Sequence, residues 1–172
     1  MNYFKFINNV SMKRYFPPEP LINLPEHPIF LGGSIEMGTV EDWQEAISHT
    51  LENILNPKKF CILNPRRKDW DSSWEQSRDH PGFRGQVEWE LEGLEKSQTI
   101  IMYLHPETKA PISLLELGLY ASSGKLLVVC PQGFWRKGNV DIVCERYGIQ
   151  QFETLDAAAE YIHSTYEKRR SI

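Results

Sequence analysis

The sequence predicts an α/β protein with an open parallel sheet of five strands, flavodoxin-like or Rossmann-like, and with helices on both faces. Short apolar runs alternate along the chain with segments whose apolar residues recur at helical spacing. The runs are apolar at successive positions, which is typical of strands that are buried on both faces, as in parallel sheets. The 172 residues, 41% of them hydrophobic and 24% charged, suit one soluble domain with a substantial core.

The chain before the first predicted strand has the character of an N-terminal arm. It contains Pro17-Pro18-Glu19-Pro20, which cannot be helical, and each residue before a proline is pushed into an extended conformation. Its aromatic residues could pack on the domain or on a partner. We therefore expect an arm at residues 1–27 and one α/β domain over residues 28–172.

The domain is predicted to alternate strands and helices throughout. The expected elements are a strand at 29–31, a helix from about 39 to 55, a strand at 60–63, a helix at 85–97, a strand at 99–104, a short helix at 111–119, a strand at 126–130, a short helix at 140–147, a weak strand at 149–152 and a final helix from 154 to about 170.

Local signals set the ends of the predicted helices. Thr39, with Asp42 three residues later, gives the first helix a start that resembles a capping box. Pro111 opens the short third helix and Gly124 follows its end, at the positions where proline and glycine are favoured. Thr154 caps the last helix, whose basic final residues suit the negative end of its dipole.

Composition excludes several classes of function. The net charge of −4 and the pI of about 5.8 argue against nucleic-acid binding. No apolar run approaches the ~20 residues that span a bilayer, so no membrane partner is expected. The five histidines lack metal-ligand spacing, and no metal site is expected. Three cysteines without CxxC spacing, and the absence of a signal-peptide pattern, predict a cytoplasmic protein.

The end of the first strand is the first candidate for a ligand site. In open parallel sheets, ligands bind beyond the carboxyl ends of the strands. Gly32 and Gly33 would let a ligand approach the backbone, and Ser34 offers a hydroxyl. The segment is neither GxGxxG nor GxxxxGK[ST], so no nucleotide cofactor is predicted. The competing interpretation is a tight turn between a strand and a helix.

The loop after the second strand is the second candidate. Trp70 and Trp74 could stack a planar base, and Asp69 and Asp71 could bind hydroxyl or ring N–H groups. Two tryptophans in five residues are a large apolar area to leave in water, which favours a lid over a substrate. The alternative is a solvated surface loop.

Glu116 is the strongest candidate for a catalytic residue in the sequence. It lies in a helix where Leu114, Leu115 and Leu117 occupy most of the circumference. A carboxylate among buried leucines is costly unless a partner or a reaction uses it. We expect the helix start to keep it ionised, as a nucleophile requires. The alternative is a glutamate that reaches water at the sheet edge.

These motifs resemble those of the nucleoside 2-deoxyribosyltransferases and the related deoxynucleoside monophosphate N-glycosidases. The resemblance covers roughly residues 28–149. It rests on Leu31-Gly32-Gly33-Ser34-Ile35 at a strand end, on Glu116-Leu117-Gly118 in a helix, and on Gly124-Lys125 before an apolar strand. It implies an enzyme that acts on a small-molecule nucleoside or nucleotide, without a cofactor.

The resemblance also implies roles for acidic residues. Glu116 would attack the sugar C1′ and form a glycosyl-enzyme ester, from which a second base or water takes the sugar. A carboxylate of the preceding helix would hold the nucleobase, and the match falls near Glu90, with Glu88 as the other candidate.

The chain departs from the family pattern before the nucleophile. Many members carry a further carboxylate about six residues earlier, where this chain has Ala110, with Ser113 in between. We expect Asp69 or Asp71 to supply the missing acid. We expect an acid in the tryptophan-rich loop to stay protonated, because desolvation raises its pKa.

Family members are typically homo-oligomers whose sites borrow residues from a neighbour, and Asn139 could be such a contribution. The alternative is that Asn139 caps a helix. Three other functions stay open. They are hydrolysis of a nucleoside or nucleotide, cleavage of an NAD-like substrate, and nucleotide binding without turnover.

Overall fold

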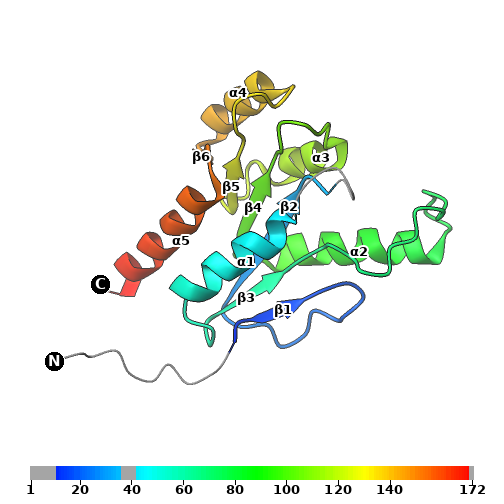
Figure 1. Ribbon diagram of the computed structural model, residues 1–172, viewed down its shortest axis with the longest axis horizontal. Helices are drawn as coiled ribbons and strands as arrows, with labels where there is room; N and C mark the ends of the chain where they lie inside the picture. Colours follow the sequence, from blue (N-terminus) through cyan, green and yellow to red (C-terminus); the bar gives the residue numbers. More distant parts are fainter. Residues whose placement is uncertain (1–10, 36–41, 171–172) are drawn as a thin grey trace.

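The computed structural model describes residues 11–35 and 42–170, and these form an open sheet of six parallel strands with five helices (Figure 1). The strands are β1 (Lys13–Tyr15), β2 (His27–Gly33), β3 (Phe60–Leu63), β4 (Thr99–Tyr103), β5 (Leu126–Val129) and β6 (Gln150–Phe152). The helices are α1 (Trp43–Ile54), α2 (Pro81–Lys96), α3 (Pro111–Tyr120), α4 (Lys137–Tyr147) and α5 (Leu155–Arg170).

The strand order is β1-β3-β2-β4-β5-β6. The five strands from β2 onward follow the flavodoxin-like order, in which the chain reverses direction across the sheet between β2 and β4. Gly33 at the end of β2 pairs with Tyr103 at the end of β4. The point between β2 and β4 where the strand order reverses, called the switch point below, therefore lies at the carboxyl ends of both strands. The predicted fold class is confirmed.

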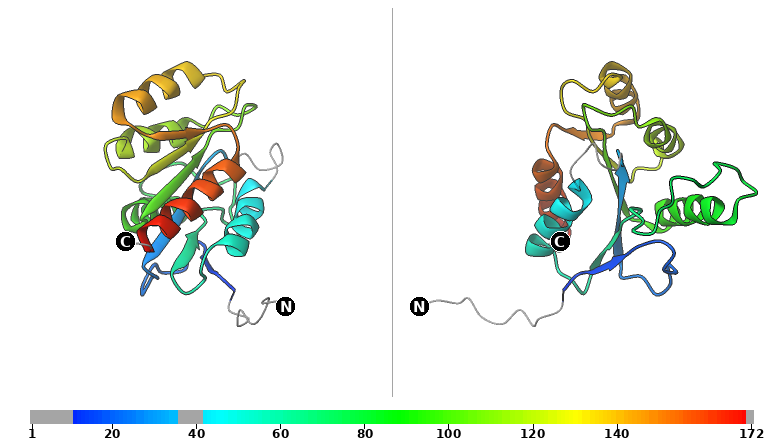
Figure 2. Two further views of the ribbon diagram at one scale, coloured as in Figure 1. Left: turned by 90° about the vertical axis from the view of Figure 1, so that its left-hand side faces the viewer. Right: turned by 45° about the vertical axis from the view of Figure 1, so that its right-hand side comes forward.

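Alternate residues of each strand face different helix layers. In β2, Ile29 and Leu31 pack with α1 and α5, whereas Phe30 packs with α2, α3 and α4. Both sets of side chains are buried, which explains why the strand is apolar at successive positions. Figure 2 shows α1 and α5 on one side of the sheet and α2 and α3 on the other.

The sheet has one strand more than the five predicted, because residues 13–15 pair with β3 as β1. This edge strand is fastened to α1, since Arg14 donates hydrogen bonds of 2.8 Å to Glu45 and Glu52. Part of the segment expected to be an arm therefore belongs to the sheet. Residues 1–10 lie outside the described residues.

The observed helix starts differ from the predicted ones in three places. Asp42 caps α1 by accepting from the backbone N–H of Glu45, while Thr39 lies outside the described residues. Helix α2 begins at Pro81, four residues early, because the His80 ring accepts from the backbone of its first turn. The prediction that Asn139 caps a helix is wrong, since α4 begins at Lys137.

A close contact sets the position of α2. A Cβ at Gly93 would lie 2.8 Å from the ring of Phe30 in β2, so only glycine lets the helix approach the sheet this closely. The Trp89 indole donates a hydrogen bond of 2.7 Å to the carbonyl of Glu19 and fixes the same helix to the N-terminal segment. The turn of α2 that carries Glu90 is therefore held over the sheet.

Candidate active site

Two carboxyls from neighbouring helices form the candidate active site. Glu116 lies in the second turn of α3 and is only 9% exposed. Glu90 lies on α2, on the same face of the sheet, and its negative charge acts on Glu116. Burial, followed by the charge of Glu90, raises the pKa of Glu116 to about 8.

This protonation state differs from the one expected from sequence. The prediction that the helix start keeps Glu116 ionised is wrong, because desolvation outweighs the helix dipole at a buried position in the second turn. Burial also raises the pKa of Glu90, against the hydrogen bond from Gln86 that lowers it. At neutral pH Glu116 is therefore protonated in the free protein, beside the negative charge of Glu90.

Gln86 connects Glu90 to the loop after β3. Its amide nitrogen donates to Glu90 Oε1 at 2.8 Å and to the carbonyl of Pro65 at 2.9 Å. The side chain is 5% exposed, and its amide oxygen has no hydrogen-bond partner among the described residues. This role of Gln86 was not predicted from the sequence. The sequence does place a glutamine one helical turn before a candidate carboxylate, a spacing at which the two side chains can meet.

Two more α3 residues lie near Glu116 along the helix. Ser113 precedes it by three residues and is buried, so the predicted binding residue shares the inward face of the helix. Tyr120 follows by four residues, and burial, Glu95 and Glu116 together raise its pKa. The inward face of α3 thus carries a hydroxyl, a carboxyl and a phenol in successive turns.

At the strand switch point, the structure uses the predicted glycine and serine residues for packing. A Cβ at Gly33 would lie 2.2 Å from the carbonyl oxygen of Tyr103, and its φ of +137° is one that other residues rarely adopt. Gly32 packs against Met102. The Ser34 hydroxyl is buried, lies 2.6 Å from the Thr108 hydroxyl and accepts from the backbone of His105. These contacts fix the segment that leads into α3.

The two loop tryptophans lie against the start of α2. Trp70 and Trp74 meet edge to face at 5.3 Å, and the Trp74 ring also lies 5.5 Å from that of His80. The Trp74 indole covers Gly82, where an added Cβ would be 3.0 Å away. Figures 1 and 2 show the loop at the far end of α2, beyond the sheet. Substrate contact by either tryptophan stays a prediction.

The loop acids are exposed to solvent. The guanidinium of Arg67 bonds Asp69 and holds the pKa of that carboxyl below its usual range. Ser73 bonds Asp71 with the same effect on its pKa. The expectation of a protonated acid in this loop is therefore wrong, because neither carboxyl is desolvated and each gains a donor.

The two remaining candidates are also exposed. Glu88 faces solvent and pairs with Arg84 one turn earlier, so of the two α2 glutamates only Glu90 acts on Glu116 in the described contacts. Asn139 lies on the surface of α4. A role for Asn139 in a neighbour's site stays a prediction.

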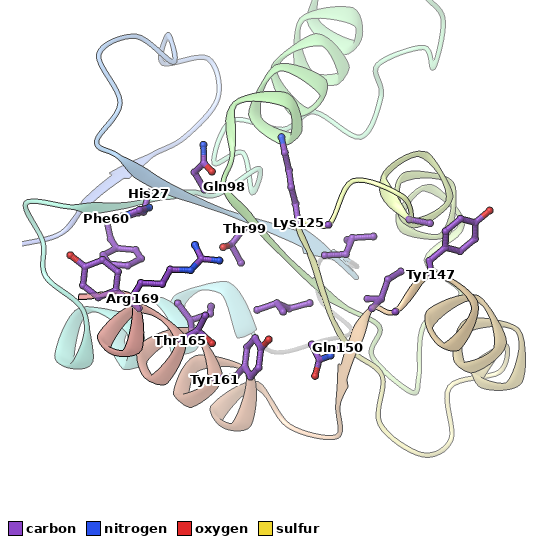
Figure 3. Close-up of a pocket in the computed structure, with 18 residues that line it drawn as sticks. His27, Phe60, Gln98, Thr99, Lys125, Tyr147, Gln150, Tyr161, Thr165 and Arg169 are labelled. Atoms are coloured by element: carbon purple, nitrogen blue, oxygen red, sulfur yellow. The ribbon is translucent and has the colours of Figure 1, made fainter. Parts of the chain in front are cut away.

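A cleft of about 330 Å³ lies at the amino ends of the strands, away from the two carboxyls (Figure 3). The first residues of β2, β3, β4, β5 and β6 line it, together with Arg169 and Tyr161 of α5, and none of its lining residues is acidic. Ligands of open parallel sheets bind at the other ends of the strands. We therefore place the candidate site at the carboxyl pair and not in this cleft.

Two further searches cover only residues 11–35 and 42–170. No group of three or more histidine, cysteine, aspartate or glutamate side chains there could hold a metal ion. None of the helices there combines the length and the apolar character needed to cross a bilayer.

The fold and the site define an α/β protein of flavodoxin-like topology with two desolvated carboxyls on adjacent helices. A family model described as "Nucleoside 2-deoxyribosyltransferase like" matches residues 26–134, more than half of the chain and both carboxyls included. The chain belongs to this family, and the resemblance predicted from sequence is confirmed.

Among solved structures, the chain is similar to a conserved protein from Enterococcus faecalis. The two chains are 11% identical, the match covers 81% of this chain and 98% of the other, and the TM-score is 0.58. This likeness shows the fold alone. No curated protein matches the chain.

Proposed function

We propose that the protein cleaves the N-glycosidic bond of a nucleoside or deoxynucleoside through Glu116 and transfers the sugar to a second base. The observation that carries this proposal is that Glu116 and Glu90 are two desolvated carboxyls on the same face of the sheet, and that the charge of Glu90 acts on Glu116. Enzymes that cleave glycosidic bonds with retention use one carboxylate as nucleophile and one carboxylic acid as proton donor. Family membership supports a nucleoside-type substrate.

In the first step, the Glu116 carboxylate attacks C1′ and forms an ester. The C1′–N bond breaks, its electron pair goes to the base nitrogen, and the leaving base takes the proton from Glu90. In the second step, a nitrogen of the incoming base attacks C1′, the ester C1′–O bond breaks, and Glu90 recovers a proton from that base. In the free protein Glu116 holds the proton beside the charged Glu90, so the reaction requires that substrate binding moves a proton to Glu90 and leaves Glu116 ionised.

The structure supports Glu90 over Asp69 as the acid. Asp69 is exposed and its pKa is lowered by Arg67, whereas burial raises the pKa of Glu90. A carboxyl whose pKa is raised gives up a proton less readily to water and is the better general acid near neutral pH than one whose pKa is lowered.

Hydrolysis of the same bond is the second candidate. Ala110 is buried at the start of α3, where the family pattern has a further carboxylate, so the chain has one acid fewer to hold an incoming base. Water would then take the sugar in the second step. We also propose a cytoplasmic location, since Cys61, Cys130 and Cys144 are free thiols.

The test is turnover of deoxynucleosides in the presence of free bases. Glu116→Ala is expected to lose about a thousandfold or more in kcat, because it removes the carboxylate that forms the ester. Glu92→Gln changes a partly exposed glutamate of α2 and serves as the matched control. Exchange of bases indicates transfer, and release of free sugar indicates hydrolysis. If Glu116→Ala is as active as the unaltered protein, the nucleophile assignment is wrong.

A further inference from the structure

We propose that Gln86 positions the Glu90 carboxyl and accepts a hydrogen bond from an amino group of the nucleobase. The site would therefore prefer bases with an exocyclic amine, such as adenine, over their oxo counterparts. This inference rests on the proposed function. It adds to that function the class of base and the residue that selects it.

The orientation of the Gln86 amide is fixed by its neighbours. The Pro65 carbonyl can only accept, and it lies 2.9 Å from the Gln86 amide nitrogen, which also donates to Glu90 Oε1 at 2.8 Å. The NH2 group must therefore face Pro65, and the amide oxygen must face elsewhere. A flipped amide would place its oxygen against the carbonyl oxygen of Pro65.

The same two bonds orient Glu90. Its Oε1 accepts from Gln86, so when the carboxyl is protonated the proton is best placed on Oε2. Gln86 and Glu90 are one helical turn apart and share a face of α2. A base bound to Glu90 would therefore lie beside the Gln86 side chain.

The Gln86 amide oxygen is buried and has no partner among the described residues. Leaving a buried acceptor unpaired costs about 1–3 kcal/mol, so a donor brought by a ligand recovers free energy there. The edge of adenine presents an acceptor, N7, beside a donor, the N6 amine. Protonated Glu90 complements N7 and the Gln86 oxygen complements N6. The corresponding edge of an oxo purine presents two acceptors, and its O6 would oppose the Gln86 oxygen.

The experiment compares deoxyadenosine with deoxyinosine as substrates, and adenine with hypoxanthine as ligands in calorimetry. The intact protein is expected to prefer the amino compound at least tenfold in kcat/KM and in Kd, because sites that pair a substrate N–H discriminate strongly against analogues that lack it. In Gln86→Met this ratio should fall to within about threefold of unity, with a lower kcat for both substrates.

Gln44→Leu is the matched control, since Gln44 is also a fully buried glutamine whose amide atoms lack partners among the described residues, but lies on α1 across the sheet. Its preference ratio should equal that of the unaltered protein, and thermal melting checks that both variants fold. Equal use of both nucleosides by the intact protein, or an unchanged ratio in folded Gln86→Met, overturns this inference but leaves the proposed function standing. Failure of the intact protein to turn over either nucleoside counts against the proposed function, and failure to bind either base overturns this inference.

Discussion

At the residue scale, the chemistry of the candidate site depends on where each acid lies relative to water. Glutamates on α2 differ in environment within one turn. Glu88 is exposed and paired with Arg84, while Glu90 is desolvated and bonded by Gln86. The sequence singled out Glu116 because of its leucine neighbours. It could not give the protonation state, because that depends on a charge 26 positions away in the chain, at Glu90.

The raised pKa of Glu116 predicts a pH-dependent stability. The folded protein binds this proton more tightly than the unfolded chain, whose carboxyl has its ordinary pKa of 4.5. The stabilising contribution is therefore fully present below pH 4.5 and is lost as the pH rises through about 8. Glu116→Gln removes the ionisation. By pH 9 it should be more stable than the unaltered protein by up to roughly 4 kcal/mol, or of order 8–16 °C in Tm.

Thermal melts from pH 5 to 9 measure this difference. The advantage of Glu116→Gln should be small at pH 5 and grow across the range, whereas Glu92→Gln, at a partly exposed ion pair, should stay within about 0.5 kcal/mol throughout. A constant difference between Glu116→Gln and the unaltered protein would show that this carboxyl titrates normally.

At the element scale, periodicity and composition predict the strands and helices but not all of their starts. The early start of α2 depends on the His80 ring, which accepts from the backbone of Phe83. That cap is unusual, and the proline that follows it occupies a favoured first position. Strand β1 was missed because three residues with the polar pattern Lys-Arg-Tyr become a strand only through pairing with β3 and through the Arg14 ion pairs.

The position of the loop tryptophans predicts that they stabilise the start of α2. Trp74→Ala removes the indole that covers Gly82 and stacks near His80 and Arg67. We expect hydrogen exchange in residues 81–88 to accelerate about tenfold, corresponding to about 1.4 kcal/mol, with no change in α3. Trp135→Ala, a half-exposed tryptophan before α4, should leave exchange at 81–88 unaltered. Uniform acceleration over the whole chain would instead indicate global destabilisation.

At the scale of the whole molecule, the sequence predicted the layered parallel sheet because each strand is apolar on both faces. The approach of Glu90 on α2 to Glu116 on α3 could not be predicted as directly, since it depends on the order of the strands and on the close approach of α2 to the sheet at Gly93. Gly32, Gly33 and Ser34 at the end of β2 make close packing contacts, while ligand contact by these residues stays a prediction.

An exposed apolar stripe on α3 leads us to propose that the protein is a homo-oligomer, as the family resemblance implies. Ile112, Leu115 and Leu119 follow each other at helical spacing on the outer side of α3, and each is about 60% exposed. Leu115→Asp places a charge in this stripe and is expected to halve the particle mass, or reduce it further, in light scattering at micromolar concentration. Ile142→Asp, on the exposed side of α4, is the control. A monomeric unaltered protein would contradict the proposal.

The most direct test of Glu116 as the nucleophile is mass spectrometry of the protein after incubation with a 2′-fluoro deoxynucleoside, whose fluorine slows breakdown of the glycosyl ester. We predict that the mass of the unaltered protein rises by one sugar, that fragmentation places the sugar on Glu116, and that Glu116→Gln gains no mass. A sugar attached to another residue, or steady release of base from the same nucleoside without any covalent adduct, would contradict it.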